Sequence, residues 1–117
     1  MSLINTLTGM KIDVNRRTFA LANKTGGVSG PCVKPVAVRM VYQVAQAVKI
    51  PILGMGGVSR GEDAAQLMLA GATAVAVGTA MFADPFAPIK VRDELADIAS
   101  RQGLERVAQL TGGVQPW

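Results

Sequence analysis

The sequence contains no histidine and a single cysteine, Cys32. One cysteine excludes an internal disulfide, and the lack of histidine excludes a zinc site or a Ser-His-Asp triad within this chain. Proton transfer by these residues would need Cys, Lys, Asp, Glu or Tyr side chains. Aromatic residues make up only 4%. No apolar run approaches the roughly 20 residues of a membrane span. The segment 1–4 is too short for a signal peptide, so we expect a soluble, cytoplasmic protein without a membrane partner.

Positive charge is distributed unevenly along the chain. The net charge is +4, yet residues 1–60 hold eight Lys or Arg against one acid, and residues 61–117 hold four against seven. The cations of the first half are scattered, and no aromatic residues interleave with them to form a stacking platform. We therefore expect no nucleic-acid partner.

The composition indicates an α/β fold. Half of the residues are apolar, most of them aliphatic, and 13 are glycines, which suits helices packed on parallel strands. Three βα units predict parallel strands with right-handed crossovers, in a narrow open sheet whose edges need cover. Expected strands are 2–5, 52–55 and 74–77, the last two covered on both faces; expected helices are 35–48, 59–70, 87–102 and 104–110. A hairpin-like excursion is expected at 9–22 and a glycine-rich loop at 23–31.

Local signals set the expected helix ends. Pro35 suits the first turn of a helix, Ser59–Glu62 has capping-box spacing, and Gly71 is a typical C-terminal stop. In helix 35–48, apolar residues at i, i+4 spacing form two adjacent rows, which predicts a broad buried stripe. The rows consist of Val36, Met40, Val44 and Val48, and of Ala37, Val41 and Ala45.

Glycines stand where two of the expected strands end. Gly56 and Gly57 follow one strand, and Gly78 follows the next with Thr79 beside it. Parallel α/β proteins bind ligands at such ends, and glycine lets a phosphate oxygen reach the backbone N–H, with a helix N-terminus adding a favourable dipole. The alternative is that these glycines only permit tight turns, but two such sites in successive βα units favour phosphate. Neither site matches a dinucleotide fingerprint or a P-loop.

Other residues carry weaker signals. Asn5 and Thr6 also end a strand and could meet a planar imide or a carboxylate, but a turn or cap pair is an equal alternative. Lys24 could face an anion, although a solvated loop lysine is the more frequent case. Cys32 precedes a helix, but it has no visible partner base, and we expect it to be inert. Trp117 is expected to be a terminal packing or tail residue.

Several segments together resemble the class 1 dihydroorotate dehydrogenases. They are Ile4–Thr6, Ala22–Pro31, Gly54–Gly57 and Val77–Thr79, and Lys34–Tyr42 is most similar to the class 1B, NAD-linked bacterial catalytic subunit. The resemblance covers nearly the whole chain. It implies that residues 1–117 form the C-terminal part of an FMN-binding TIM (β/α)8 barrel, about strands six to eight.

The resemblance also implies a function, which is oxidation of dihydroorotate to orotate in pyrimidine (UMP) biosynthesis with FMN as the cofactor. It assigns substrate binding to Asn5 and Thr6. It further implies that Ile4 and Gly30 are backbone positions near the flavin, and that the cradle for the FMN phosphate is formed by Gly56, Gly57, Gly78 and Thr79. The family's catalytic cysteine and flavin-contacting lysine lie upstream of the Asn-Thr pair. We therefore expect no catalytic residue here and no activity from the chain alone; Cys32 lies at a different motif position.

The partners implied by the resemblance are dihydroorotate or orotate, a second copy in a homo-oligomer, and an electron-transfer subunit that carries FAD and a [2Fe–2S] cluster. Two alternatives remain open. One is a non-catalytic phosphate- or flavin-binding partial barrel that self-associates. The other is a different FMN barrel, such as a dihydropyrimidine dehydrogenase or glutamate-synthase relative, against which Asn5-Thr6 and the Thr25–Pro31 loop argue.

Overall fold

Three short strands form a parallel sheet. The computed structural model describes residues 1–116; Trp117, expected to be a packing or tail residue, lies outside the described residues. The strands are β1 (Ser2–Leu3), β6 (Leu53–Met55) and β7 (Ala74–Ala76), in the order β1-β6-β7. Leu3 is in register with Gly54, and Gly54 with Val75. The predicted parallel arrangement is confirmed.

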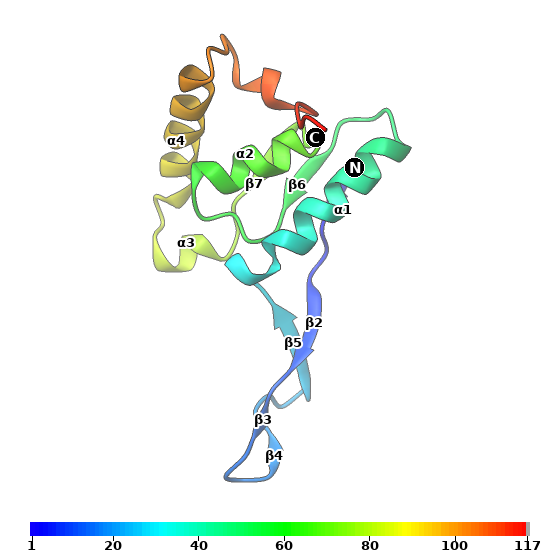
Figure 1. The fold of residues 1–117 in the computed structure, drawn as a ribbon. Coiled ribbons are helices and arrows are strands. Elements are labelled where there is room, and N and C mark those ends of the chain that lie inside the picture. Colours follow the sequence, from blue (N-terminus) through cyan, green and yellow to red (C-terminus); the bar gives the residue numbers. More distant parts are fainter. Residues whose placement is uncertain (117) are drawn as a thin grey trace.

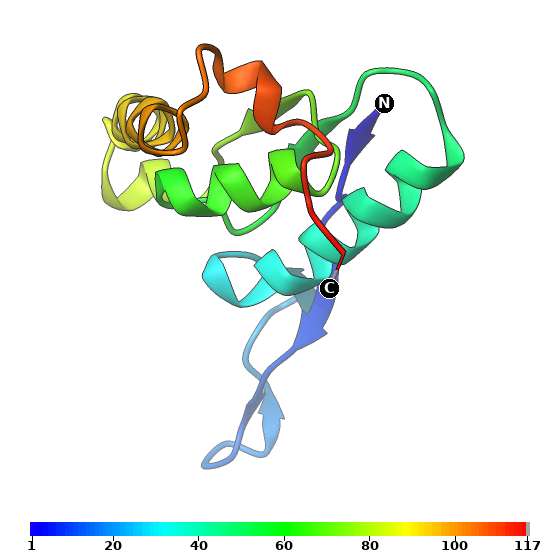
Figure 2. The same ribbon diagram turned by 45° about the horizontal axis from the view of Figure 1, so that its top comes forward.

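Helices α1 (Lys34–Ala47) and α2 (Gly61–Leu69) pack on the sheet, and α4 (Ala87–Arg101) packs beside α2 (Figures 1 and 2). A 3-10 turn, η1 (Pro31–Val33), precedes α1. These three helices begin and end within about two residues of the predicted bounds, and Gly71 follows α2 with a φ of 125°, as a C-terminal stop requires. Within residues 1–116, the helices lack the length and apolar character needed to cross a bilayer.

Residues 7–28 form a two-part antiparallel arm that projects away from the helices (Figure 1). In its base, β2 (Leu7–Met10) pairs with β5 (Thr25–Val28). In its tip, β3 (Ile12–Asp13) pairs with β4 (Thr18–Phe19). The predicted hairpin-like excursion is confirmed, and the arm helps to give the molecule extents of 56 × 33 × 26 Å.

Three local predictions were wrong, and one helix was missed. Residues 23–31 are not all loop, because the glycines of β5 fit a strand in which neighbours approach closely: a Cβ on Gly27 would lie 2.5 Å from Thr6 Cγ2. The 104–110 helix is only the 3-10 turn η2 (Val107–Leu110), since so short a segment nucleates a helix poorly. The four-residue helix α3 (Ala80–Ala83) was missed. The acidic residue that caps α2 is Asp63 rather than Glu62.

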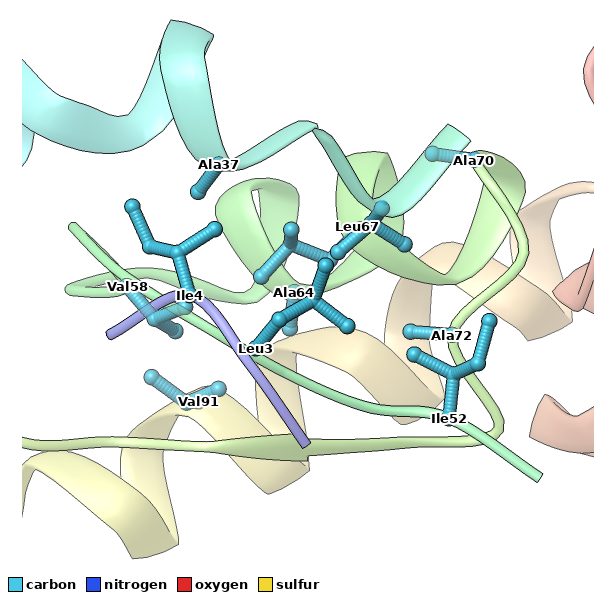
Figure 3. Close-up of a cluster of buried hydrophobic side chains, with 11 residues drawn as sticks. Leu3, Ile4, Ala37, Ile52, Val58, Ala64, Leu67, Ala70, Ala72 and Val91 are labelled. Carbon is cyan, nitrogen blue, oxygen red and sulfur yellow. The ribbon is translucent and has the colours of Figure 1, made fainter. Parts of the chain in front are cut away.

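The main core lies between the sheet and helices α1, α2 and α4, where side chains from all four converge (Figure 3). Ala37 and Val41 of α1 are fully buried, and so is Leu67 of α2. The predicted stripe on α1 is thus confirmed along the row of Ala37 and Val41, whereas the row from Val36 to Val48 is only partly buried. Gly54 permits this close packing, because a Cβ there would lie 3.0 Å from the Cβ of Ala72. A second cluster joins α2, α4 and η2 through Ala65, Met68, Ala99 and Leu110.

The opposite face of the sheet is not covered by the described residues. Leu53 is 37% exposed, and its neighbours in register, Ser2 and Ala74, are also exposed. The prediction that 52–55 and 74–77 are covered on both faces is therefore wrong for this chain. The helices supply cover on one side only, which agrees with the expected narrow open sheet.

Replacement of Leu67 by Ala tests the core. We expect Leu67→Ala to lower the free energy of unfolding by about 2–5 kcal/mol, because it leaves a cavity among fully buried side chains. The matched control is Leu21→Ala on the arm, where the leucine is 45% exposed. Urea unfolding followed by circular dichroism measures both variants. Equal losses would contradict the position of the core.

Candidate functional site

A cavity of about 640 Å³ lies at the carboxyl ends of the three parallel strands. This volume is typical of small-molecule sites. Its walls come from the segments that follow β1, β6 and β7, from the segment that joins the arm to η1, and from the first half of α4. All eight residues singled out from the sequence line it: Ile4, Asn5, Thr6, Gly30, Gly56, Gly57, Gly78 and Thr79.

The glycines after β6 form a tight turn that the packing itself requires. Gly56 and Gly57 have φ values of 121° and 76°, in the region that favours glycine. A Cβ on Gly57 would lie 2.8 Å from Lys34 Cβ and 2.9 Å from the carbonyl oxygen of Gly30. The tight-turn alternative therefore explains why these two positions are glycine. It does not explain what their backbone N–H groups bind.

At Gly78, which follows β7, packing does not require a glycine, in contrast to Gly57. A Cβ built on this residue would meet no atom within 4 Å. No hydrogen bond between described residues uses the amide N–H of Gly57, Gly78 or Thr79. Unpaired N–H groups beside a cavity are ready donors for an anion. The arrangement can therefore bind a group rich in oxygen acceptors.

The start of α2 holds carboxylates of the protein itself. Asp63 Oδ2 accepts hydrogen bonds from the N–H groups of Ser59 and Arg60, at 2.9 and 3.0 Å. Glu94 Oε2 accepts one from the N–H of Gly61 at 2.6 Å. The expectation that a helix N-terminus adds to anion binding is thus corrected for α2. The free amides belong to the turns that precede the helices.

Asp63 also forms a largely buried ion pair with Lys34. Lys34 Nζ lies 2.5 Å from Asp63 Oδ1, and the two side chains are only 23% and 9% exposed. Burial alone raises the pKa of the Asp63 carboxyl, but hydrogen bonds from Lys34, Ser59 and Arg60 outweigh burial and hold the pKa below its ordinary value of 3.8. Sequence reasoning missed this pair, because no local spacing connects residues 29 positions apart.

Asn5 and Thr6 lie just beyond the carboxyl end of β1. The amide N–H of Thr6 donates to Asn5 Oδ1 at 2.7 Å. This contact is expected if the two residues form a turn or cap pair. Both residues are exposed and line the cavity, so the Asn5 amide NH₂ and the Thr6 hydroxyl can still reach a ligand. The structure is thus compatible with both readings.

Lys24 and Cys32 do not line the cavity. Lys24 lies on the arm, with its Nζ 5.6 Å from the centre of the Phe19 ring. The thiol of Cys32 is exposed and donates to the carbonyl oxygen of Ser29 at 3.6 Å. Among the described residues, no cluster of His, Cys, Asp and Glu could hold a metal ion.

Sequence reasoning missed the charged residues of the cavity wall, Asp84, Lys90 and Glu94. Lys90 Nζ lies 2.5 Å from Asp84 Oδ2, and this contact, with a hydrogen bond from the N–H of Phe86, lowers the pKa of Asp84. The spacing of six residues is not a helical one, so no sequence signal pointed to the pair.

Comparisons with known proteins identify relatives of the chain. The family model "Dihydroorotate dehydrogenase" matches residues 1–99. The catalytic subunit of dihydroorotate dehydrogenase B (NAD(+)) from Lachnoclostridium phytofermentans is 57% identical over 115 residues, which are 98% of this chain and 38% of the relative. The same subunit from Halalkalibacterium halodurans is 57% identical over 113 residues, 97% and 37% of the two chains. The chain thus spans less than two-fifths of these relatives.

A solved structure shares the fold. The crystal structure of dihydroorotate dehydrogenase from Eimeria tenella in complex with ferulenol superposes with a TM-score of 0.78 at 29% identity, covering 96% of this chain and 30% of the other. The ligand-free enzyme of the same organism gives a TM-score of 0.75.

The Asp63 carboxylate predicts a pH dependence of stability. Because its pKa is lowered in the folded state, its contribution is present above 3.8 and is lost as pH falls through the folded pKa. We expect Asp63→Asn to be less stable at neutral pH and to lose less stability than wild type between about pH 5 and pH 2. Urea midpoints across this range measure the effect; parallel curves would contradict it. Asp97→Asn, on the exposed side of α4, is the control.

Proposed function

The chain belongs to the dihydroorotate dehydrogenase family and forms part of its α/β barrel. We therefore propose that the residues that line the cavity hold the phosphate of FMN and one edge of dihydroorotate. The observation that carries this proposal is the set of unused backbone N–H groups at two successive strand ends, which line one cavity. Phosphate oxygens are strong acceptors that match such donors.

The chemistry of the cavity fits a phosphate held by neutral donors. The charged wall residues, Asp84, Lys90 and Glu94, bring two carboxylates against one ammonium group, and Lys90 is paired with Asp84. Cations therefore contribute little, and the amides of Gly57, Gly78 and Thr79 supply the attraction. Hydrogen bonds to a charged acceptor are the stronger kind, so a few well-placed amides suffice.

The remaining predicted site residues divide between flavin and substrate. Asn5 and Thr6 bind dihydroorotate through their amide and hydroxyl groups, while Ile4 and Gly30 present backbone to the flavin. The residues of the cavity would hold FMN, which would supply the hydride acceptor for the oxidation of the substrate. The residues of this chain bind and orient both molecules, and the catalytic base comes from the part of the enzyme that precedes Asn5 in the family.

The relatives extend beyond the residues that match this chain. The relatives are named as catalytic subunits of an NAD(+)-linked enzyme, and we propose a partner subunit that carries FAD and a [2Fe–2S] cluster and passes electrons to NAD. Assembly of the catalytic subunits into a homo-oligomer, function in the cytoplasm, and a role in UMP biosynthesis belong to the same proposal.

Titration of the purified chain with FMN tests the proposal. We expect saturable quenching of flavin fluorescence, with weaker binding of riboflavin because it lacks the phosphate. Dihydroorotate should reduce no dye with the chain alone, and activity should return when the upstream segment of a relative is supplied. Equal affinity for FMN and riboflavin would refute the phosphate site. Binding without any restored activity would favour a non-catalytic module, for which self-association is the further prediction.

Replacement of Gly78 by Ala tests the cradle more locally. Because a Cβ there meets no protein atom, the urea midpoint should not change, but the methyl group would obstruct an approaching phosphate. We expect FMN affinity to fall by about tenfold or more, the worth of a hydrogen bond to a charged group. Riboflavin affinity is the internal control and should remain unchanged. Unaltered FMN affinity would place the phosphate elsewhere.

A further inference from the structure

The Lys34–Asp63 ion pair lies directly behind two walls of the cavity. Lys34 begins α1, immediately after the Gly30–Val33 segment, most of which lines the cavity. Asp63 binds Ser59 through both the N–H and the hydroxyl of that residue, and Ser59 ends the wall that starts at Met55. Neither charged residue lines the cavity itself. Their single contact therefore joins two separate lining segments from behind.

The contact between these segments is close at the glycine turn. The backbone nitrogen and Cβ of Lys34 lie 2.9 and 2.8 Å from the place where a Cβ of Gly57 would stand. The carbonyl oxygen of Gly30 lies 2.9 Å from the same place. The start of α1 is thus packed directly against the Gly57 turn, and we expect a displaced helix start to move Gly57, whose N–H has no partner among the described residues.

The ion pair is suited to holding this arrangement in one geometry. With side chains only 23% and 9% exposed, the two groups interact where water screens poorly. Asp63 accepts three further hydrogen bonds, so its charge is compensated from several directions. Removal of Asp63 leaves the largely buried Lys34 ammonium group without its partner, and removal of Lys34 leaves the Asp63 carboxylate with only the hydrogen bonds from Ser59 and Arg60. Donors fixed beforehand bind an anion better than donors that must be ordered on binding.

We infer that Lys34 and Asp63 are positioning residues for the phosphate subsite: their ion pair clamps the Gly56–Gly57 turn against the start of α1 and presets the free amides. The inference rests on the proposed function, since it concerns how that same site is built. It assigns a role in recognising the phosphate to two residues that do not line the cavity.

The rival explanation is direct electrostatics, in which Lys34 attracts the phosphate through space. The two explanations predict opposite effects of the Asp63→Asn substitution on the affinity for FMN. If Lys34 acts by charge, Asp63→Asn removes a negative charge near the site and strengthens FMN binding. If the pair acts by positioning, Lys34→Met and Asp63→Asn both weaken FMN binding. The double variant then loses little beyond either single one, because both remove the same clamp.

The experiment measures dissociation constants for FMN and riboflavin with the full chain. Their ratio isolates the phosphate contribution, because general loss of stability affects both ligands alike. We expect Lys34→Met and Asp63→Asn each to lower the FMN preference on the order of tenfold. Lys34→Arg should retain most of it. The charge-matched control is Lys11→Met on the arm, away from the cavity, which should leave the ratio unchanged.

The outcomes separate the inference from the function on which it rests. If wild type shows no preference for FMN over riboflavin, the phosphate site itself is refuted. If wild type prefers FMN and Asp63→Asn keeps or raises the preference, only the positioning role is overturned. Should the first two variants not fold, Lys34→Gln and Asp63→Glu replace them. Asp63→Glu retains the charge and displaces the carboxylate, so an unchanged ratio there overturns the inference as well.

Discussion

Parallel pairing of β1, β6 and β7 is the constraint from which the rest of the structure follows. Since the strands run in one direction, their carboxyl ends share one edge of the sheet, and the segments after them must meet there. The crossover helices α1 and α2 then fall on one face. Residues as far apart as Asn5, Gly57 and Gly78 share one cavity for this reason alone. The site is a consequence of topology before any side chain is considered.

The two explanations of the glycines, tight turns and ligand binding, prove to be compatible. Packing demands glycine at position 57, because Lys34 and Gly30 occupy the space that a side chain would need. The same turn leaves the N–H of Gly57 without a partner among residues 1–116. At Gly78, packing makes no demand, and the open space beside the amide is the feature that a ligand would use. A glycine can therefore be required by the fold at one strand end and by binding at the next.

The sequence predicted the features that depend on local pattern. The parallel direction of the strands, the bounds of α1, α2 and α4, and the residues brought together at the cavity followed from periodicity, from the rules of parallel sheets and from family resemblance. Features that depend on distant contacts did not follow. The Lys34–Asp63 pair joins residues from different helices, and β5 exists only because the arm folds back on β2. The burial of β6 was overestimated. An apolar run shows that a strand is suited to burial on both faces, but it does not show which elements cover those faces.

The uncovered face of the sheet and the supported glycine turn place different requirements on the rest of the barrel. A closed barrel covers both faces of every strand, whereas here Leu53 remains exposed on one side, in a chain that spans 38% of the relative from Lachnoclostridium phytofermentans. Anything that depends on the barrel interior therefore needs further strands. The glycine turn, in contrast, is supported by Lys34, Asp63 and Gly30, all within this chain. The proposed phosphate site therefore depends on contacts within this chain, whereas the uncovered face of the sheet is the part that further strands of a closed barrel would cover.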